Sequence, residues 1–401
     1  MSPNMNMKMN GPRLFFACIL VIGFIHIIFR HRDFVHCAKL HASTRSSNSL
    51  KELPVNRSLR ASENKVPPAY RLAARQVVTN KTISELNNLD KIHFHLIMTK
   101  FVKGKSILQF QRPSRILHHI DYSYRQRRVI ESILYHHPNA EVIVHTNYML
   151  DSDFAPFIKA GYSVRTAQLS FETLAVGTPL EGAMSQARWK EWEIGKHWYT
   201  CFSDLYRLLI LWKIGGVYID TDMVVMKPFK DLDRAVGFQD PDRGVINCAI
   251  MVFRRPRSPY IWRCMAEVSA HYDGEHWGAN GPMVLTRVWQ RWANHTERDA
   301  AVRVLDQIAF YLFHHRDARH HCFNTSVPDH RRLAYAQALA ARAPYAVHTS
   351  NKMTWTLGRE LPAGSFCHYI FTRFCLFCDQ EPPRPPSYPV VDVHGTRVEL
   401  L

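Results

Sequence analysis

The sequence predicts an α/β domain with a mainly parallel central sheet over residues 89–380. Apolar runs with strand character alternate with helical patterns in this part of the chain, an order that is typical of parallel sheets covered by helices. Of the 401 residues, 46% are hydrophobic and 21% are charged, which is ordinary globular composition. A chain of this length can bury a sizeable core.

Ahead of this domain, residues 14–29 (LFFACILVIGFIHIIF) predict a transmembrane helix that follows a cytosolic tail over residues 1–13. The run is apolar apart from His26, and flanking arginines can snorkel where it falls short of the ~20 residues that span a bilayer. A cleaved signal peptide is the alternative. The charged segment Arg30-His31-Arg32-Asp33 follows the run where small residues would mark a cleavage site, so we favour a signal anchor.

Other features favour a body in the lumen of the secretory pathway, although the positive-inside rule slightly disfavours this orientation. Residues 30–88 are polar and turn-rich and predict a stem. Sequons for N-glycosylation occur at Asn56, Asn80, Asn294 and Asn324.

The cysteines agree with an oxidising compartment. One of the nine, Cys18, lies in the apolar run, and the even set beyond it suits disulfides in pairings that the sequence cannot give. A zinc site at Cys375-x-x-Cys378, with Cys367 and His368 nearby, is the competing interpretation, although a second cysteine pair is missing.

Within the domain, the first strand is expected at 92–98 (IHFHLIM) and a helix at 125–137, where Pro138-Asn139 breaks it. Further strands are expected at 141–145 and 162–164. Residues 381–401 begin with a proline-rich stretch (EPPRPPSYP) and predict an extended tail.

The net charge of +17 favours anionic partners. The sequence shows no zinc-finger pair, RNA-recognition signature or block of Lys and Arg, so we do not expect it to bind nucleic acid. A basic surface without a specific partner is equally compatible with this charge.

The most informative stretch is 201–229 (CFSDLYRLLILWKIGGVYIDTDMVVMKPF). We expect a helix that Ser203 caps and that Gly215-Gly216 ends. Residues 217–225 then predict a buried strand in which Asp220 and Asp222 share a face. Bare carboxylates beside an apolar strand are costly unless a cation compensates them, and Mg²⁺ or Mn²⁺ prefers such oxygen ligands. The pair therefore predicts a metal site that can bridge to a diphosphate.

Asp204 and Arg207 are three residues apart and share a helix face, so Arg207 could neutralise Asp204 or reach a phosphate. A surface ion pair, which stabilises little, is the alternative. Asp231-Leu232-Asp233 repeats the acidic pattern, but we interpret it as a solvated loop. Residues 220–224 (DTDMV) also fit the nucleophile motif of haloacid-dehalogenase-like phosphatases, yet the later acidic pair that those enzymes need for Mg²⁺ is missing.

Residues 203–223 (SDLYRLLILWKIGGVYIDTDM) resemble the sugar-binding region of glycosyltransferase family 32, in its α1,4-galactosyltransferase and α1,4-N-acetylglucosaminyltransferase branch. Further segments are similar in the same order: 178–180 with Trp189 and Trp192, 245–249 (VINCA), 277–288 (WGANGPMVLTRV) and 345–348 (YAVH) with Asn351-Lys352. The likeness is strong over 201–288. Residues 300–342 and the end from Trp355 show little of it, which leaves the acceptor open.

The resemblance implies a GT-A-like single nucleotide-sugar-binding domain, a UDP-sugar donor, Mn²⁺ (or Mg²⁺) and retention of anomeric configuration. It also implies a single-pass type II protein of the Golgi membrane with a lumenal catalytic domain. By position, it assigns the metal and the donor to Asp220 and Asp222, with His348 as a third metal ligand or else a structural histidine. The resemblance also implies that Asp204 and Arg207 bind the donor. It places Asn247, Asn280 and Gly281 in the lining of the donor or acceptor cleft.

The expected reaction moves a hexose, galactose or N-acetylglucosamine, to a hydroxyl of a glycolipid or glycoprotein glycan in an α linkage. An α-mannosyltransferase that uses GDP-mannose on N-glycans or inositol phosphoceramide is the sister alternative. An inactive carbohydrate-binding or scaffold protein of the secretory pathway is the alternative from another class. No residue stands out in the sequence as a catalytic base or nucleophile.

Overall fold

The structure, a computed structural model, describes residues 91–99, 123–292, 302–323, 336–351 and 365–378. The described residues fall within one compact unit. The expected tail, anchor, stem and C-terminal tail, and the four sequon asparagines, lie outside these ranges. In the part of the chain that the structure describes, no helix has both the length and the apolar character needed to cross a membrane.

A seven-stranded mixed sheet forms the centre of the domain, in the order β3-β2-β1-β4-β7-β6-β8. The four strands β3, β2, β1 and β4 are parallel, β7 is antiparallel to both β4 and β6, and β8 is parallel to β6. The strands are β1 (His93–Met98), β2 (Glu141–Thr146), β3 (Ser163–Gln168), β4 (Gly216–Ile219), β6 (Ala235–Asp240), β7 (Val245–Phe253) and β8 (Arg303–Leu305). The predicted α/β class with a mainly parallel sheet is confirmed at this level.

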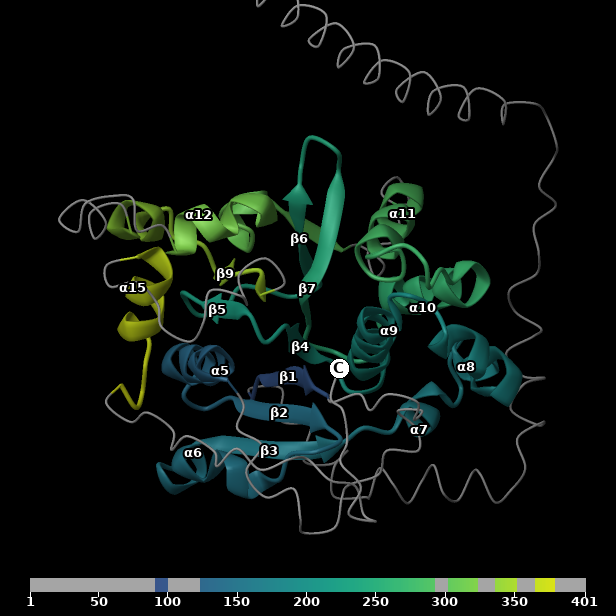
Figure 1. The fold of residues 1–401 in the computed structure, drawn as a ribbon, viewed down its shortest axis with the longest axis horizontal. Helices are drawn as coiled ribbons and strands as arrows, with labels where there is room; N and C mark the ends of the chain where they lie inside the picture. The colour runs from purple at the N-terminus through teal and green to yellow at the C-terminus, as the bar shows by residue number, and fades with distance from the viewer. Residues whose placement is uncertain (1–90, 100–122, 293–301, 324–335, 352–364, 379–401) are drawn as a thin grey trace, which may run out of the picture. The chain divides into compact units, whose positions relative to one another are not determined.

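Helices cover both faces of this sheet and bury two apolar clusters (Figure 1). One face carries α5 (Tyr124–His136), α6 (Ala155–Lys159), α12 (Ala318–Phe323) and α15 (Phe366–Arg373). The other face carries α7 (Phe171–Ala175), α8 (Gln186–Glu193), α9 (Trp198–Lys213), α10 (Pro259–His271) and α11 (Pro282–Trp292). Both clusters arise because the side chains of a strand point alternately to the two faces.

Short elements complete the chain. A two-stranded antiparallel sheet pairs β5 (Met223–Val225) with β9 (Ala346–His348). Single 3₁₀ turns are η1 (Asp151–Phe154), η2 (Glu181–Met184), η4 (Gln307–Ala309) and η5 (His315–Asp317). The small sheet joins segments more than a hundred residues apart, at the position where the acidic motif leaves the central sheet.

The predicted strands at 92–98, 141–145 and 162–164 are confirmed as β1, β2 and β3, and the predicted helix at 125–137 is confirmed as α5. Ser123 caps α5, since its Oγ accepts from the amide of Gln126 while the Gln126 side chain accepts from the amide of Ser123. The chain reversal after α5 contains Pro138, as expected.

Two predictions in the motif stretch are wrong. The helix α9 begins at Trp198 rather than after Ser203, because residues 198–202 (WYTCF) bury Trp198, Cys201 and Phe202 in the core. Burial of this apolar turn outweighs the capping preference of a serine. The segment 217–225 is also not one strand, since β4 ends at Ile219 and β5 begins in another sheet at Met223.

The cysteines pair only in part. Disulfides join Cys322 to Cys367, which links α12 to α15, and Cys375 to Cys378. The zinc interpretation of the CxxC segment is therefore wrong, because both of its sulfurs are used in a disulfide. Among the cysteines that the structure describes, Cys201, Cys248 and Cys264 are free and buried, so the expected disulfides are confirmed for two pairs only.

Candidate functional site

The acidic motif is positioned by a helix–Gly-Gly–strand unit. Gly215 and Gly216 adopt φ values of 77° and 99°, which other residues rarely adopt. A Cβ at Gly216 would lie 2.6 Å from the carbonyl oxygen of His93, so only glycine allows β4 to approach β1 this closely. The chain thus turns sharply from α9 into β4 and delivers the two aspartates at the end of that strand.

Asp220 and Asp222 lie in a turn and not on one face of a strand. The amide of Asp220 donates to the carbonyl of Ala249 on β7 at 2.7 Å, and the amide of Met223 donates back to the carbonyl of Asp220 at 3.1 Å. This turn, rather than the expected pleat, brings the two carboxylates to the same place.

The C-terminal segment holds Asp222 from the other side. Met223 pairs with His348 in the β5–β9 ladder, and the amide of Asn351 donates to Asp222 Oδ2 at 2.8 Å. His348 Nε2 lies 3.3 Å from Asp222 Oδ1. Between them, Ser350 adopts a φ of 52°, a left-handed conformation that is costly for a residue other than glycine and that often occurs at functional sites.

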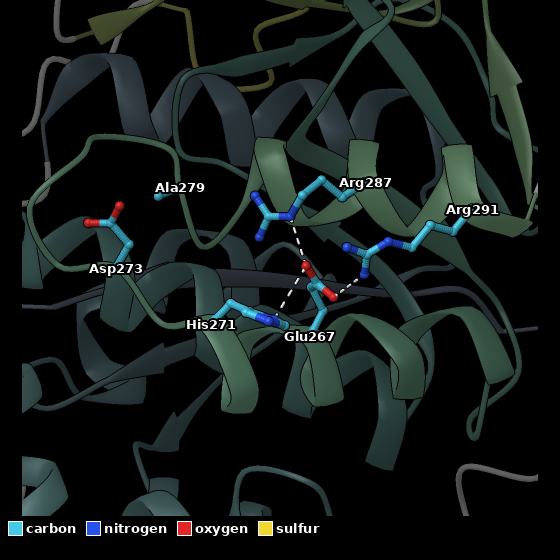
Figure 2. Close-up of a pocket in the computed structure, with 6 residues that line it drawn as sticks. All are labelled: Glu267, His271, Asp273, Ala279, Arg287 and Arg291. Atoms are coloured by element: carbon cyan, nitrogen blue, oxygen red, sulfur yellow. Dashed lines mark hydrogen bonds and ion pairs between the residues drawn. The ribbon is translucent and has the colours of Figure 1, made fainter. Parts of the chain in front are cut away.

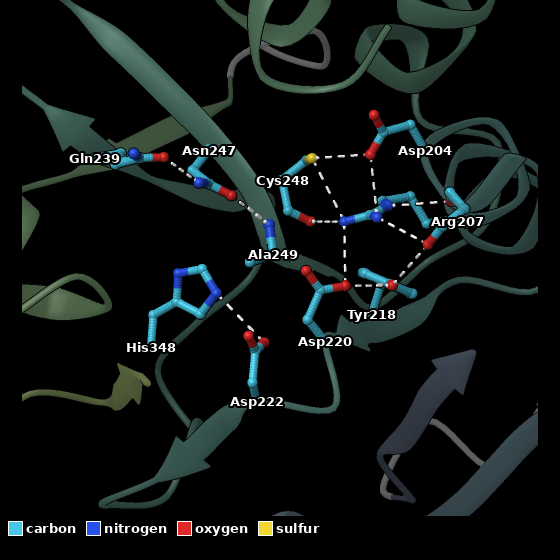
Figure 3. A network of polar contacts seen from close by, with 11 residues as sticks. Asp204, Arg207, Tyr218, Asp220, Asp222, Gln239, Asn247, Cys248, Ala249 and His348 are labelled. Atoms are coloured by element: carbon cyan, nitrogen blue, oxygen red, sulfur yellow. Dashed lines mark hydrogen bonds and ion pairs between the residues drawn. The ribbon is translucent and has the colours of Figure 1, made fainter. Parts of the chain in front are cut away.

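Asp220, Asp222 and His348 form a group that could hold a metal ion (Figure 3). One ligand atom from each residue lies within 4.8 Å of the other two. Burial alone would raise the pKa of Asp222, but the charge and hydrogen bond of His348 lower it below its usual range. Burial would likewise lower the pKa of His348, and Asp222 raises it instead. The Asp222 carboxylate is therefore kept ionised, as a cation ligand must be.

Arg207 lies behind this group and contacts two of the predicted carboxylates. Its Nη2 is 3.0 Å from Asp204 Oδ1, and its Nη1 is 3.3 Å from Asp220 Oδ1. The guanidinium also lies over the ring of Tyr218, at 4.4 Å from the ring centroid. Arg207 is 4% exposed and Asp204 2%, so the alternative of a surface ion pair is wrong.

Burial sets the electrostatics of this interior cluster. It raises the pKa of Asp204 to about 6, because the attraction of Arg207 offsets the lost hydration only in part and Asp220 adds repulsion. Burial also raises the pKa of Asp220, against the opposing charge of Arg207. A bound cation would therefore stabilise the ionised forms of Asp204 and Asp220, because it would lower the free-energy cost of burying their charges.

Gly281 and Asn280 lie beside Asp204. A Cβ at Gly281 would be 2.5 Å from the Cγ of Asp204, so glycine is needed there for a close approach. The Asn280 side chain is fully buried, donates to the carbonyl of Asp273 at 2.6 Å and accepts from the amide of Asp273 at 3.0 Å. These bonds hold the 273–280 loop, and a direct contact of Asn280 with a donor stays a prediction.

Asn247 projects from β7 toward the same cluster, two hydrogen bonds away from Asp220. Its Oδ1 accepts from the amide of Ala249 at 2.7 Å, and its Nδ2 donates to Gln239 Oε1. The structure thus brings six of the predicted residues into one connected site: Asp204, Arg207, Asp220, Asp222, Gly281 and His348. Asn247 joins it through the backbone of Ala249.

Sequence reasoning missed Gln239, Arg125 and the backbone role of Asn351. Arg125 is buried on α5, donates to Asn351 Oδ1 at 3.4 Å and acts by its charge on Asp222. No local pattern marks Gln239 or Arg125, because their neighbours in the site come from distant strands. The second acidic pair, Asp231 and Asp233, is exposed, as expected for a loop.

A separate hollow lies between α10 and α11 (Figure 2). Its side chains satisfy one another, since the Glu267 carboxylate accepts from Arg287 Nε at 2.8 Å and from Arg291 Nη1 at 2.5 Å. Ala279 forms part of its wall, next to Asn280. The ion pairs stabilise α10 against α11, and the metal-ligating group is not among its lining residues.

Comparison with protein families gives two matches along the chain. Residues 123–239 match the glycosyltransferase sugar-binding region that contains a DXD motif, and residues 254–381 match the α1,4-glycosyltransferase conserved region. The second match includes 300–342 and the segment from Trp355 to 381, where the sequence analysis found little likeness. The likeness to the family therefore extends over these two segments as well.

The chain is 30% identical over 260 residues to rat (Rattus norvegicus) lactosylceramide 4-alpha-galactosyltransferase, covering 61% of this chain and 68% of that one. It is 31% identical over 99 residues to human (Homo sapiens) alpha-1,4-N-acetylglucosaminyltransferase, covering 24% and 27%. Among solved structures, PaToxG glycosyltransferase has a TM-score of 0.34 and 16% identity, covering 58% of this chain and 83% of that one. A TM-score this low supports no conclusion about function.

Proposed function

Because this chain belongs to the α1,4-glycosyltransferase family, we propose that it is a metal-dependent, retaining hexosyltransferase. It takes galactose or N-acetylglucosamine from a UDP-sugar and forms an α linkage to a hydroxyl of a glycolipid or glycan. The main support for this proposal is that ligand atoms of Asp220, Asp222 and His348 lie close together, next to the buried Arg207.

The donor set fits a hard or borderline divalent cation. Two carboxylates and one imidazole suit Mn²⁺, and Mg²⁺ is compatible with the carboxylates. The raised pKa of Asp220 has the same implication, since burial without a cation disfavours its ionised form. A bound cation would neutralise the donor diphosphate and stabilise it as a leaving group.

The chain's own residues prepare the site for that donor. Asn351 and His348 keep both oxygens of Asp222 oriented, and Arg207 fixes Asp220 from the interior. The Asp204 carboxylate is buried against the Gly281 backbone, and its Oδ2 has no hydrogen-bond partner among the described residues, so we propose that it accepts from a sugar hydroxyl. These contacts exist before a ligand binds, so little reorganisation is needed when the glycosidic bond stretches.

Location follows from the same proposal. We propose that the domain adopts a GT-A-like fold and faces the lumen of the Golgi, with residues 14–29 as a type II anchor, 30–88 as a stem and N-glycans on the sequons. The apolar run and the two disulfides of the domain support this address.

The test is a matched pair of substitutions. Asp222→Asn removes a ligand charge, and we expect it to abolish transfer while the protein stays folded. Asp233→Asn makes the same chemical change in the exposed second acidic pair, and we expect it to keep full activity. Transfer from UDP-galactose, UDP-N-acetylglucosamine and GDP-mannose is measured across a Mn²⁺ titration.

Full activity of the Asp222 variant would refute the metal site. Transfer from GDP-mannose alone would replace the proposed donor by the mannosyl one. If the wild-type protein transferred and hydrolysed none of the donors, with or without the cation, the enzymatic proposal would be wrong and an inactive binding protein would remain.

A further inference from the structure

A row of two side-chain amides, Asn247 and Gln239, lies near the metal-ligating group (Figure 3). Beyond Gln239, the row ends at His315 of η5. It begins at the amide of Ala249, which donates to Asn247 Oδ1 at 2.7 Å. Asn247 Nδ2 contacts Gln239 Oε1, and Gln239 Nε2 lies 2.7 Å from His315 Nδ1. We call the three side chains Asn247, Gln239 and His315 the amide relay.

The direction of every bond in the amide relay is fixed by its first member. A backbone N–H can only donate, so the Asn247 atom facing Ala249 must be the carbonyl oxygen. The NH₂ group of Asn247 then faces Gln239, which must present its own oxygen. Gln239 in turn directs its NH₂ group at His315, whose Nδ1 must accept. His315 is therefore neutral, with its proton on Nε2.

The surroundings of His315 support the neutral form. Its pKa is lowered by burial, and the charges of His314, Arg316 and His348 act in the same direction, while Asp317 opposes them. The ring of His314 lies 4.0 Å away, centroid to centroid. A proton on Nδ1 would bring two donors face to face at Gln239.

The backbone at Gln239 is built to direct this side chain. The β6–β7 register shifts between Phe238 and Asp240, so Gln239 sits at a β-bulge near the end of β6. Bulges re-aim side chains and are frequent next to active sites. The main chain there is held separately, since Gln307 Nε2 donates to the carbonyl of Gln239 at 2.9 Å. The Gln239 side chain is thus not needed to hold the strand.

The amide relay leaves one N–H of Asn247 unused. An asparagine NH₂ group has two protons, and within the described ranges Gln239 takes one and no group takes the other. Asn247 is connected to the metal-ligating group through Ala249, whose amide donates to Asn247 Oδ1 and whose carbonyl accepts from the amide of Asp220. An unused donor on a side chain that is 5% exposed is suited to a ligand oxygen.

We propose that Gln239 and His315 are positioning residues that orient Asn247, so that its second N–H donates to an oxygen of the bound sugar. This inference rests on the proposed glycosyl transfer and names two residues that determine its geometry. His315 comes from η5, which lies within the segment that matches the α1,4-glycosyltransferase conserved region.

Kinetics test the inference with three variants. His315→Phe removes the acceptor, and we expect kcat/KM for transfer to fall about five- to tenfold, as for the loss of one orienting hydrogen bond. Affinity for UDP alone should be unchanged. His315→Asn places an oxygen where Nδ1 stood and should restore transfer. His314→Asn, a change at the neighbouring histidine outside the relay, is the control and should behave as wild type.

A second measurement is independent of activity. In ¹⁵N-histidine NMR of the whole protein, the His315 signals are identified by their loss in the His315→Asn variant. We expect a neutral ring with an unprotonated Nδ1. A cationic ring at neutral pH, or a proton on Nδ1, would overturn the amide relay.

The failures can be told apart. Wild-type protein that transfers no sugar refutes the proposed function, and the NMR result then decides the relay by itself. Active wild type with an equally active His315→Phe variant refutes the positioning role and leaves the glycosyltransferase proposal standing.

Discussion

Replacing Gly281 by alanine should displace the Asp204 carboxylate from Arg207 and so inactivate the candidate site. The added Cβ would lie 2.5 Å from Asp204 Cγ and 2.6 Å from both carboxylate oxygens. Real Cβ contacts of this length do not occur, so the carboxylate must move by about 1 Å to regain van der Waals separation. Asp204 has little room to move, because it is 2% exposed and lies 3.0 Å from Arg207.

Two effects add to the cost of this substitution. Overpacking of a close-packed interior costs about 1–3 kcal/mol. Pulling Asp204 from Arg207 leaves two buried charges poorly compensated, for which complete separation costs about 3–5 kcal/mol. A partial displacement therefore predicts a loss near 2–4 kcal/mol, which lowers the melting temperature by roughly 4–10 °C in a domain of this size. Transfer activity should be lost as well.

Thermal unfolding in two backgrounds is the assay. In the Asp204→Ala background the clash disappears, so Gly281→Ala should cost less than about 1 kcal/mol there. Gly182→Ala is the matched control, because the nearest atom to its new Cβ is Arg188 Nη1 at 4.0 Å. Equal losses from Gly281→Ala in both backgrounds would show that the contact with Asp204 is not the cause, and the reasoning would fail.

Further predictions concern stability. The pKa of Asp204 is about 6 in the fold against 3.8 in the unfolded chain, so the native state binds more protons and stability should fall as pH rises from about 4 to about 6. This change in the free energy of unfolding is roughly 3 kcal/mol, and it should be absent from the Asp204→Asn variant when urea unfolding is measured at both ends of this pH range. Glu131→Gln should destabilise by about 3–5 kcal/mol, because its buried carboxylate neutralises two buried arginines of α5; an unchanged urea midpoint would contradict this. Replacing Cys322 and Cys367 by serine should lower the free energy of unfolding by about 2–4 kcal/mol in the same assay. If a reducing agent lowered the urea midpoint of this variant as much as that of the wild type, the result would argue against that disulfide.

The order of strands and helices could be predicted because it depends on local patterns. The alternation of strand-like and helical runs up to residue 168 needs only side-chain periodicity and turn residues. The start of α9 could not be predicted in this way. Ser203 is a good cap in isolation, but Trp198 and Phe202 are buried by packing against segments far away in the sequence.

The sequence predicted that Asp220 and Asp222 form a cation site, but the structure brings them together by a different route from the one expected. Two carboxylates in an apolar run indicated a cation site, and Asp220 and Asp222 do meet His348. They meet because the chain turns after β4 and pairs β5 with β9, and not because they share the face of a strand. Pairing over such a distance leaves no local signal, so only the family resemblance could single out His348 among the 23 histidines.

Charge balance explains why these separately predicted residues belong together. At neutral pH, above the pKa of Asp204, the site holds the carboxylates of Asp204, Asp220 and Asp222 against the guanidinium of Arg207. Burial raises the pKa values of Asp204 and Asp220, so the charge of Arg207 offsets only part of the cost of keeping these two carboxylates ionised. In a chain whose net charge is +17, this acidic interior cannot reflect general composition. A bound cation would offset the remaining cost, and under the proposed function it would also supply positive charge for the diphosphate of a sugar nucleotide.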